Sequence, residues 1–194
     1  MAMNDRYTPP RLLWLASLLL CLGCAPPPQI REYTIHKETP DRLLGGIALH
    51  GAQAWYFKIT GPRKELDAQL PDIRTFLKSL RFTDNAEQPT WTLPSGWKLD
   101  PKERMGRIAT IRVPLGESEA ELSVTALPFP PQQDEATYLL ANVNRWRDQL
   151  SQSHVTVEEL AALEIIPAEG LEVRLVSISG KQKASTGMTP PFAS

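Results

Sequence analysis

The chain has 194 residues, of which 42% are hydrophobic and 22% are charged, and its formal net charge is −1 at pH 7. This composition is typical of a folded globular protein and unlike that of a disordered chain. Because no excess of basic residues is available to neutralise a phosphate backbone, we expect no nucleic-acid partner.

The first 23 residues have the pattern of an export signal that ends in a lipidation site. Two arginines precede an apolar run at residues 12–22 that is too short to span a bilayer. Gly23 then stands directly before Cys24, as the small residue does in a bacterial lipobox. We therefore predict a lipoprotein signal peptide at residues 1–23 and an acyl anchor on Cys24. Plain secretion after cleavage near Gly23, or retention of the segment as a short anchor, are the alternatives.

Residues 24–30 contain three consecutive prolines and predict a stiff spacer between the membrane and a folded domain. Both cysteines of the chain lie before this spacer or at its start, so we expect no disulfide and no thiolate metal site in the domain. The three histidines have no metal-ligand spacing, and we expect neither a metal nor a cofactor. The predicted location is the bacterial cell envelope, on its periplasmic or outer surface.

The first part of the domain is predicted to consist of strands. Residues 31–37 alternate between apolar and polar side chains, which is typical of a half-buried strand. Residues 43–50 and 53–60 are apolar runs separated by a short turn, and they predict an antiparallel hairpin. Gly45 and Gly46 lie in the middle of the first run, where they indicate a bulge or a close approach of the backbone to another segment.

An amphipathic helix is predicted at residues 63–80, because apolar residues recur there at spacings of 4, 3, 4 and 3. We expect Thr60 or Gly61 to cap this helix and Pro62 to occupy its first turn, where a missing N–H costs nothing. Pro71 lies within the apolar pattern and predicts a kink, or a restart as a second helix.

The second half of the chain follows a polar linker at residues 83–89 and mixes strands with helices. Alternation predicts a second hairpin, a helical apolar stripe predicts the second main helix, and Thr156 is expected to cap a short helix. These elements are strands at 106–113 and 120–127, a helix at 135–150, a short helix at 155–163 and a strand at 171–178.

The predicted fold class is α+β, with an antiparallel sheet of six to seven strands covered by two main helices. We expect both helices to pack over the same β layer, in one core, and to leave no reactive cavity. Residues 31–180 are predicted to form a single domain. Its two halves are expected at residues 31–83 and 90–180, followed by a loosely packed tail at 181–194.

Two signatures in the sequence resemble a known family. The first is WYFKITGP at residues 55–62, followed by a helix and by FLKSLRF at 76–82. The second is WTLPSGW at 91–97, followed by a hairpin and by NVNRWRDQL at 142–150. Together they resemble a family of uncharacterised exported lipoproteins of planctomycete-type bacteria, over about residues 31–180. That resemblance implies export but no known activity.

The same pieces also resemble the PsbP-type fold in a changed order. In that fold the element with the Pro-x-Gly-Trp motif comes first, and the strand–helix–SLRF element closes the domain. Here the closing element comes first, which suggests a circularly permuted PsbP-like domain or the remnant of a tandem pair. Permutation is tolerated where the natural termini lie close together. PsbP-type domains act as assembly and binding modules without a shared active site, so the resemblance implies no functional residues.

The most distinctive polar cluster is Arg145, Trp146 and Arg147 on the predicted helix at 135–150. In a functional interpretation, its guanidinium groups donate paired hydrogen bonds to a carboxylate or phosphate of a partner. In a structural interpretation, the arginine stems pack over aromatic rings and pair with carboxylates or loop carbonyls. We favour the structural interpretation for this cluster.

The sequence shows no recognisable catalytic constellation. We therefore expect a membrane-tethered, non-enzymatic lipoprotein that binds a protein partner or assists envelope assembly. One alternative is a periplasmic enzyme that uses His36 or His50 with a nearby carboxylate. Another is a small-ligand carrier whose apolar groove is lined by Tyr56, Trp91 and Trp97.

Overall fold

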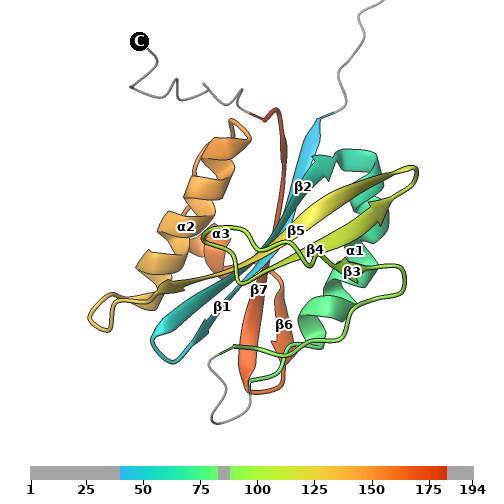
Figure 1. Cartoon of the computed structure of the whole chain (residues 1–194). Helices are drawn as coiled ribbons and strands as arrows, with labels where there is room; N and C mark the ends of the chain where they lie inside the picture. Colours follow the sequence, from blue (N-terminus) through green and yellow to red (C-terminus); the bar gives the residue numbers. More distant parts are fainter. Residues whose placement is uncertain (1–39, 83–87, 183–194) are drawn as a thin grey trace, which may run out of the picture. The chain divides into compact units, whose positions relative to one another are not determined.

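The computed structural model describes residues 40–82 and 88–182, which contain a seven-stranded antiparallel sheet in the order β3-β4-β5-β2-β1-β7-β6 (Figure 1). The predicted α+β class with one antiparallel sheet is confirmed. The predicted features at residues 1–37, at 83–87 of the linker and at 183–194 of the tail lie outside the described residues. The elements are β1 (Asp41–His50), β2 (Gln53–Pro62), α1 (Arg63–Lys78), β3 (Lys98–Leu99), β4 (Ala109–Leu115), β5 (Ser118–Pro128), α2 (Glu135–Gln149), α3 (Val157–Ala161), β6 (Ile165–Ala168) and β7 (Leu171–Gly180).

The hairpin β1–β2 lies at the centre of the sheet. Its register runs without interruption from the pair Asp41–Pro62 to the pair His50–Gln53, so the predicted hairpin is confirmed and it contains no bulge. β5 pairs with the outer edge of β2, and β7 pairs with the outer edge of β1. The first two described strands in the sequence therefore form the central pair, and strands that come later in the sequence pair on both sides of it.

The two glycines of β1 allow close approach on opposite faces of the sheet. A Cβ atom on Gly45 would lie 2.4 Å from the carbonyl oxygen of Phe57 and 2.9 Å from the ring of Trp146 on α2. A Cβ atom on Gly46 would lie 2.8 Å from Leu77 on α1. Of the two predicted explanations for this glycine pair, close approach is correct.

Helix α1 begins at Arg63, and Pro62 is its N-cap residue without a side-chain cap hydrogen bond. The predicted cap at Thr60 or Gly61 is therefore wrong, because β2 continues through both residues. The predicted restart at Pro71 is also not seen, since one helix runs past it. Pro71 is exposed, so solvent can satisfy the backbone carbonyl that loses its partner.

The two main helices cover the same sheet but pack on opposite faces, in separate cores (Figure 1). The expectation of one shared core is wrong. Successive residues of a strand point to opposite faces, and both faces of β1 are buried: Leu44 and Ala48 pack in the α1 core, whereas Leu43 and Ile47 pack in the α2 core. A continuous apolar run is the sequence pattern of a strand that is buried on both sides.

Two short strands, β3 and β6, were not predicted. Strands β3 and β6, with two and four residues, have too few residues to show alternation. Helix α3 is capped as predicted, because the Thr156 side chain accepts from the Glu159 N–H and the Glu159 side chain accepts from the Thr156 N–H. None of the helices within residues 40–82 and 88–182 is both long and apolar enough to cross a membrane.

Candidate anion-binding site

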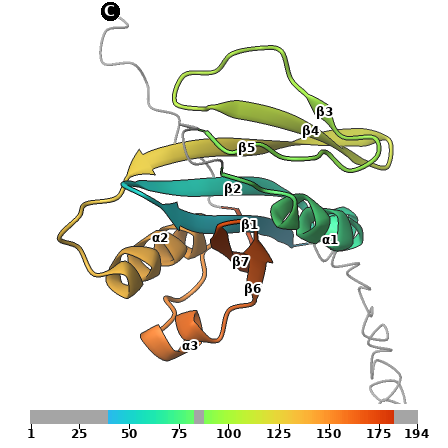
Figure 2. The same cartoon turned by 90° about the horizontal axis from the view of Figure 1, so that it is seen from below.

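Helix α2 covers only part of its face of the sheet. Its buried residues pack against β1, β2 and β7, while β4 and β5 lie further across the sheet (Figure 2). Ile111 of β4 and Leu122 and Val124 of β5 point into the α1 core. Their neighbours therefore turn polar side chains to the α2 face, among them Arg112, Glu121 and Ser123.

A hollow of about 400 Å³ lies where α2 meets this polar part of the sheet. Strands β2 and β5 form its floor, α2 forms one wall, and the loop between β3 and β4 forms the other wall. The lining residues that matter here are Lys58 and Ser123 on the floor, Arg145 and Gln149 on α2, and Met105 and Arg107 on the loop.

The hollow gathers three cationic side chains. Lys58 Nζ donates a hydrogen bond to Gln149 Oε1 at 3.1 Å, and this amide partner is neutral. Arg107 Nη1 forms an ion pair with Glu121 Oε2 at 3.0 Å. The Arg145 side chain forms no hydrogen bond or ion pair with any other residue of the described ranges 40–82 and 88–182. Only one of the three cations is therefore neutralised by a carboxylate there.

The electrostatics of Lys58 reflect this excess of positive charge. Burial lowers the pKa of the Lys58 ammonium group, and the guanidinium groups of Arg145 and Arg107 lower it further. Both effects arise because the charged form lies away from bulk water and next to like charges. An anion in the hollow would offset both penalties, which makes the hollow suited to a carboxylate or phosphate group.

Tyr56 contributes a neutral hydroxyl between this hollow and the α2 core. Its hydroxyl donates to the Tyr138 hydroxyl at 2.9 Å. Burial raises the pKa of Tyr56, and the hydrogen bond with Tyr138 raises it further. Tyr56 is therefore a neutral phenol over the range in which proteins are normally handled, and it adds no negative charge to the hollow.

The structure separates the three residues of the predicted cluster. Arg145 lines the hollow, as the functional interpretation requires. Trp146 is only 3% exposed and packs in the α2 core, with its ring 6.1 Å from that of Tyr56. Arg147 Nε donates to the backbone carbonyl of Ser153 and so holds the segment after α2. Consecutive helical residues are about 100° apart, so the three cannot share one face.

Sequence reasoning missed Lys58 and Arg107, the two partners of Arg145 in the hollow. One signal for Lys58 was available. It stands two residues after Tyr56 on the same face of a largely apolar strand, and a lysine at such a position requires a polar or open surrounding. Arg107 lies in an irregular loop, where no periodicity indicates which way a side chain points.

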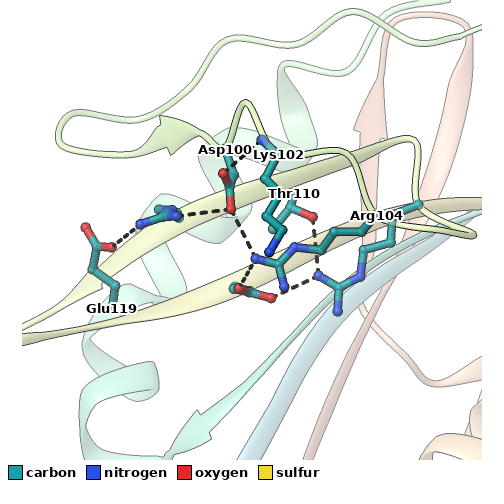
Figure 3. A network of polar contacts seen from close by, with 8 residues as sticks. Asp100, Lys102, Arg104, Thr110 and Glu119 are labelled. Carbon is teal, nitrogen blue, oxygen red and sulfur yellow. Dashed lines mark hydrogen bonds and ion pairs between the residues drawn. The ribbon is translucent and has the colours of Figure 1, made fainter.

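A second polar cluster centres on the carboxylate of Asp100, whose side chain is only 2% exposed (Figure 3). This carboxylate accepts hydrogen bonds from the backbone N–H of Lys102 at 3.1 Å, from Arg104 Nη2 at 3.1 Å and from Arg112 Nη2 at 3.2 Å. Asp100 thus joins the start of the β3–β4 loop to strand β4.

The charges of the Asp100 cluster are balanced, unlike those of the hollow. Arg104 and Arg107 both pair with Glu121, and Arg112 also pairs with Glu119 at 3.6 Å. Three guanidinium groups therefore face three carboxylates. We interpret this cluster as structural, because it holds the loop that carries Arg107 to the wall of the hollow.

The Asp100 cluster predicts a dependence of stability on acid pH. The Lys102 N–H lowers the pKa of Asp100, and hydrogen bonds from Arg104 and Arg112 lower it further. A carboxyl group with a lowered pKa in the fold stabilises it fully above the unfolded pKa, and this contribution is lost as pH falls through the folded pKa. We expect Asp100→Asn to lower the Tm at neutral pH and to flatten the acid limb of the stability profile, measured by thermal unfolding across pH.

The matched control for this variant is Asp72→Asn on α1, which lies outside the Asp100 cluster. This substitution also removes one carboxylate, and it should leave the Tm near that of the parent protein. Equal acid limbs for the parent and for Asp100→Asn would contradict the structural role of the cluster.

The histidines do not converge on a catalytic site within the described residues. His50 stacks on Phe82 with 4.0 Å between ring centroids. His154 Nε2 lies 3.1 Å from Asp148 Oδ1, on the exposed surface rather than in a cavity. His36 lies outside the described residues. In the ranges 40–82 and 88–182, no group of three His, Cys, Asp or Glu side chains is arranged to hold a metal ion.

The aromatic residues considered for a ligand groove pack mainly into the two cores. Tyr56 packs in the α2 core, while Trp55 and Phe57 pack in the α1 core. Trp97 is buried in the α1 core, and Trp91 is half-buried against it. The alternation of β2 explains this division, because both faces of the strand are covered.

Comparisons with models of protein families, with curated proteins and with solved structures find no match to this chain. The resemblances to planctomycete-type lipoproteins and to the PsbP-type fold therefore depend on the sequence motifs alone. The hollow between α2 and the β3–β4 loop is consequently the main structural basis for a functional proposal.

Proposed function

We propose that this chain is a lipid-anchored protein of the bacterial cell envelope, and that its domain is a non-enzymatic module that binds an anionic group of a protein partner. The binding site is the hollow formed by Lys58, Arg107 and Arg145. The observation that carries the proposal is the excess of positive charge at this concave site, where Lys58 and Arg145 have no carboxylate partner among the described residues. Such a group of cations can bind an anion through charge alone, whatever sequence surrounds the anion in the partner. This recognition needs no catalytic group.

We also propose that the domain is a circularly permuted PsbP-like fold, and the pairing of the first and last described strands supports this. Asp41 in the first described strand pairs with Gly180 in the last. A permuted order requires the two ends of the domain to lie close together. The apolar run, Gly23 and Cys24 support the anchored part, with residues 24–30 as the spacer.

Anion affinity is expected to depend on the positive charges of Lys58 and Arg145. We expect Lys58→Gln and Arg145→Gln each to weaken binding of phosphate and acetate by about tenfold, because each removes a charge that faces the anion. Lys64→Gln, on the exposed face of α1, is the matched control and should bind like the parent protein. NMR titration of the backbone and side-chain N–H signals measures all of these affinities. Unchanged affinity in both hollow variants would contradict the proposed site.

The pKa of Lys58 also predicts a pH dependence for this binding. The charged or titratable groups lining the hollow with Lys58 are Tyr56, Arg107 and Arg145. The guanidinium groups stay charged and the raised pKa keeps Tyr56 neutral, so Lys58 alone titrates. Since protonated Lys58 attracts the anion, affinity should fall as pH rises through its lowered pKa, and anion binding should be accompanied by proton uptake there. Lys58→Gln should abolish this fall, which titrations across alkaline pH would show.

Lipidation is tested by the intact mass of the protein from bacterial membranes. We expect the mature chain to begin at Cys24 and to carry acyl groups, and we expect Cys24→Ala to leave the membrane fraction. A mature mass without added lipid would contradict the anchored part of the proposal and would leave the anion site intact.

A further inference from the structure

The hollow combines its cations with exposed apolar side chains. Among residues 40–82 and 88–182, the exposed large hydrophobic side chains are Leu99, Met105, Leu127, Val157 and Ile165. Two of these five, Met105 and Leu127, line the same hollow as Lys58 and Arg145. Met105 is fully exposed at the loop wall, and Leu127 is 40% exposed near the end of β5. The ligand therefore meets positive charge and apolar surface side by side.

The floor between these groups is polar. Ser123 Oγ donates to the backbone carbonyl of Lys58 at 3.2 Å, and the half-buried Thr125 lies two residues further along β5. Gln149 faces the same space from α2. These hydroxyl and amide groups suit a ligand that itself carries hydrogen-bonding groups next to its charge.

The size of the hollow and the nature of its floor favour a short peptide over a lipid. Its volume of about 400 Å³ lies near the lower end of the usual range for ligand sites, roughly 300–1,000 Å³. A long acyl chain would require an apolar channel, whereas here apolar surface occurs at the rim and polar groups form much of the floor. A peptide offers a carboxylate, backbone amides and one apolar side chain in the same small volume.

We infer that the hollow binds a short segment of a partner protein in which an aspartate or glutamate stands next to an apolar residue. The carboxylate is held by Lys58 and Arg145, and the apolar side chain lies against Met105 and Leu127. This inference rests on the proposed anion site, and it adds the chemical class of the ligand. Arg107, already paired with Glu121, contributes long-range attraction rather than a direct bond.

The test uses the full chain and blocked short peptides of glycine and serine with a central glutamate–leucine pair. Two matched peptides replace the glutamate with glutamine or the leucine with serine, and acetate and dodecanoate are the non-peptide probes. We expect the glutamate–leucine peptide to bind, and we expect loss of its carboxylate to weaken binding by about tenfold and loss of its leucine by about fivefold. Met105→Ser should lower the ratio of peptide affinity to acetate affinity, whereas Ile165→Ser, an exposed residue on β6, should not.

The outcomes of this titration separate the inference from the proposed function. If acetate binds but neither the leucine nor Met105 affects peptide affinity, the inference fails and the anion site stands. If dodecanoate binds more tightly than the glutamate–leucine peptide, the ligand is a lipid and the inference also fails. If none of the anions binds, both the inference and the proposed anion site fail.

Discussion

Replacing Gly45 with alanine will destabilise the domain by about 3 kcal/mol, which is a large share of the roughly 5–15 kcal/mol that stabilises a typical domain. The added Cβ would lie 2.4 Å from the carbonyl oxygen of Phe57, a backbone atom that cannot rotate away. It would also lie 2.9 Å from the ring of Trp146. Relief requires movement of β2 or of α2, and either movement disturbs a packed core.

Two other glycines provide a graded comparison for this variant. The atoms nearest to the Cβ of Gly46→Ala belong to side chains, Val173 at 2.6 Å and Leu77 at 2.8 Å, so this variant should cost less. Gly61→Ala would meet the tip of Leu115 at 3.3 Å, which can shift, and should cost least. Denaturant unfolding gives the three free energies. An equal cost for Gly45→Ala and Gly61→Ala would show that Phe57 and Trp146 do not approach Gly45 this closely.

We expect Trp146→Ala to destabilise the domain by about 3–5 kcal/mol, as truncation of a buried aromatic residue does. Trp146 is 3% exposed, and its ring packs against Tyr56 and over Gly45, where the lack of a side chain leaves room for it. Its neighbour Arg145 lines the hollow and lacks a partner in the described residues. Arg145→Gln should therefore change the free energy of unfolding by less than about 0.5 kcal/mol.

The two variants divide the predicted cluster into a residue that supports folding and a residue that supports binding. The measurements are denaturant unfolding of each variant and anion titration of the folded protein. Arg145→Gln should unfold like the parent protein while losing most of its anion affinity. If Arg145→Gln unfolds as readily as Trp146→Ala, then Arg145 is structural and the proposed site is wrong.

Local periodicity was sufficient to predict most of the secondary structure. The alternation in β4 and β5 predicts their hairpin, and the apolar stripe from Leu139 to Trp146 predicts α2. Both signals depend on residues within one element. The arrangement of the helices could not be predicted in this way, because Leu43 and Leu44 are equally apolar and their sequence does not say which helix each one meets.

The candidate site was only partly predictable for a related reason. Arg145 belongs to a distinctive cluster in the sequence, but its partners come from β2 and from a loop that are distant along the chain. Only the sheet order, with β5 between β4 and β2, brings Lys58 and Arg107 to the same hollow. The prediction of the α1 cap was wrong because of a contact between distant parts of the chain. Pairing with β1 extends β2 over residues that would otherwise cap a helix.

The burial of β1 on both faces has a consequence for how the domain melts. Neighbouring residues of this strand complete different cores, so detachment of either helix exposes apolar surface on a central strand that both cores require. Neither layer can become solvated while the other remains intact. Thermal unfolding should therefore be a single cooperative transition, in which the calorimetric enthalpy equals the van't Hoff enthalpy.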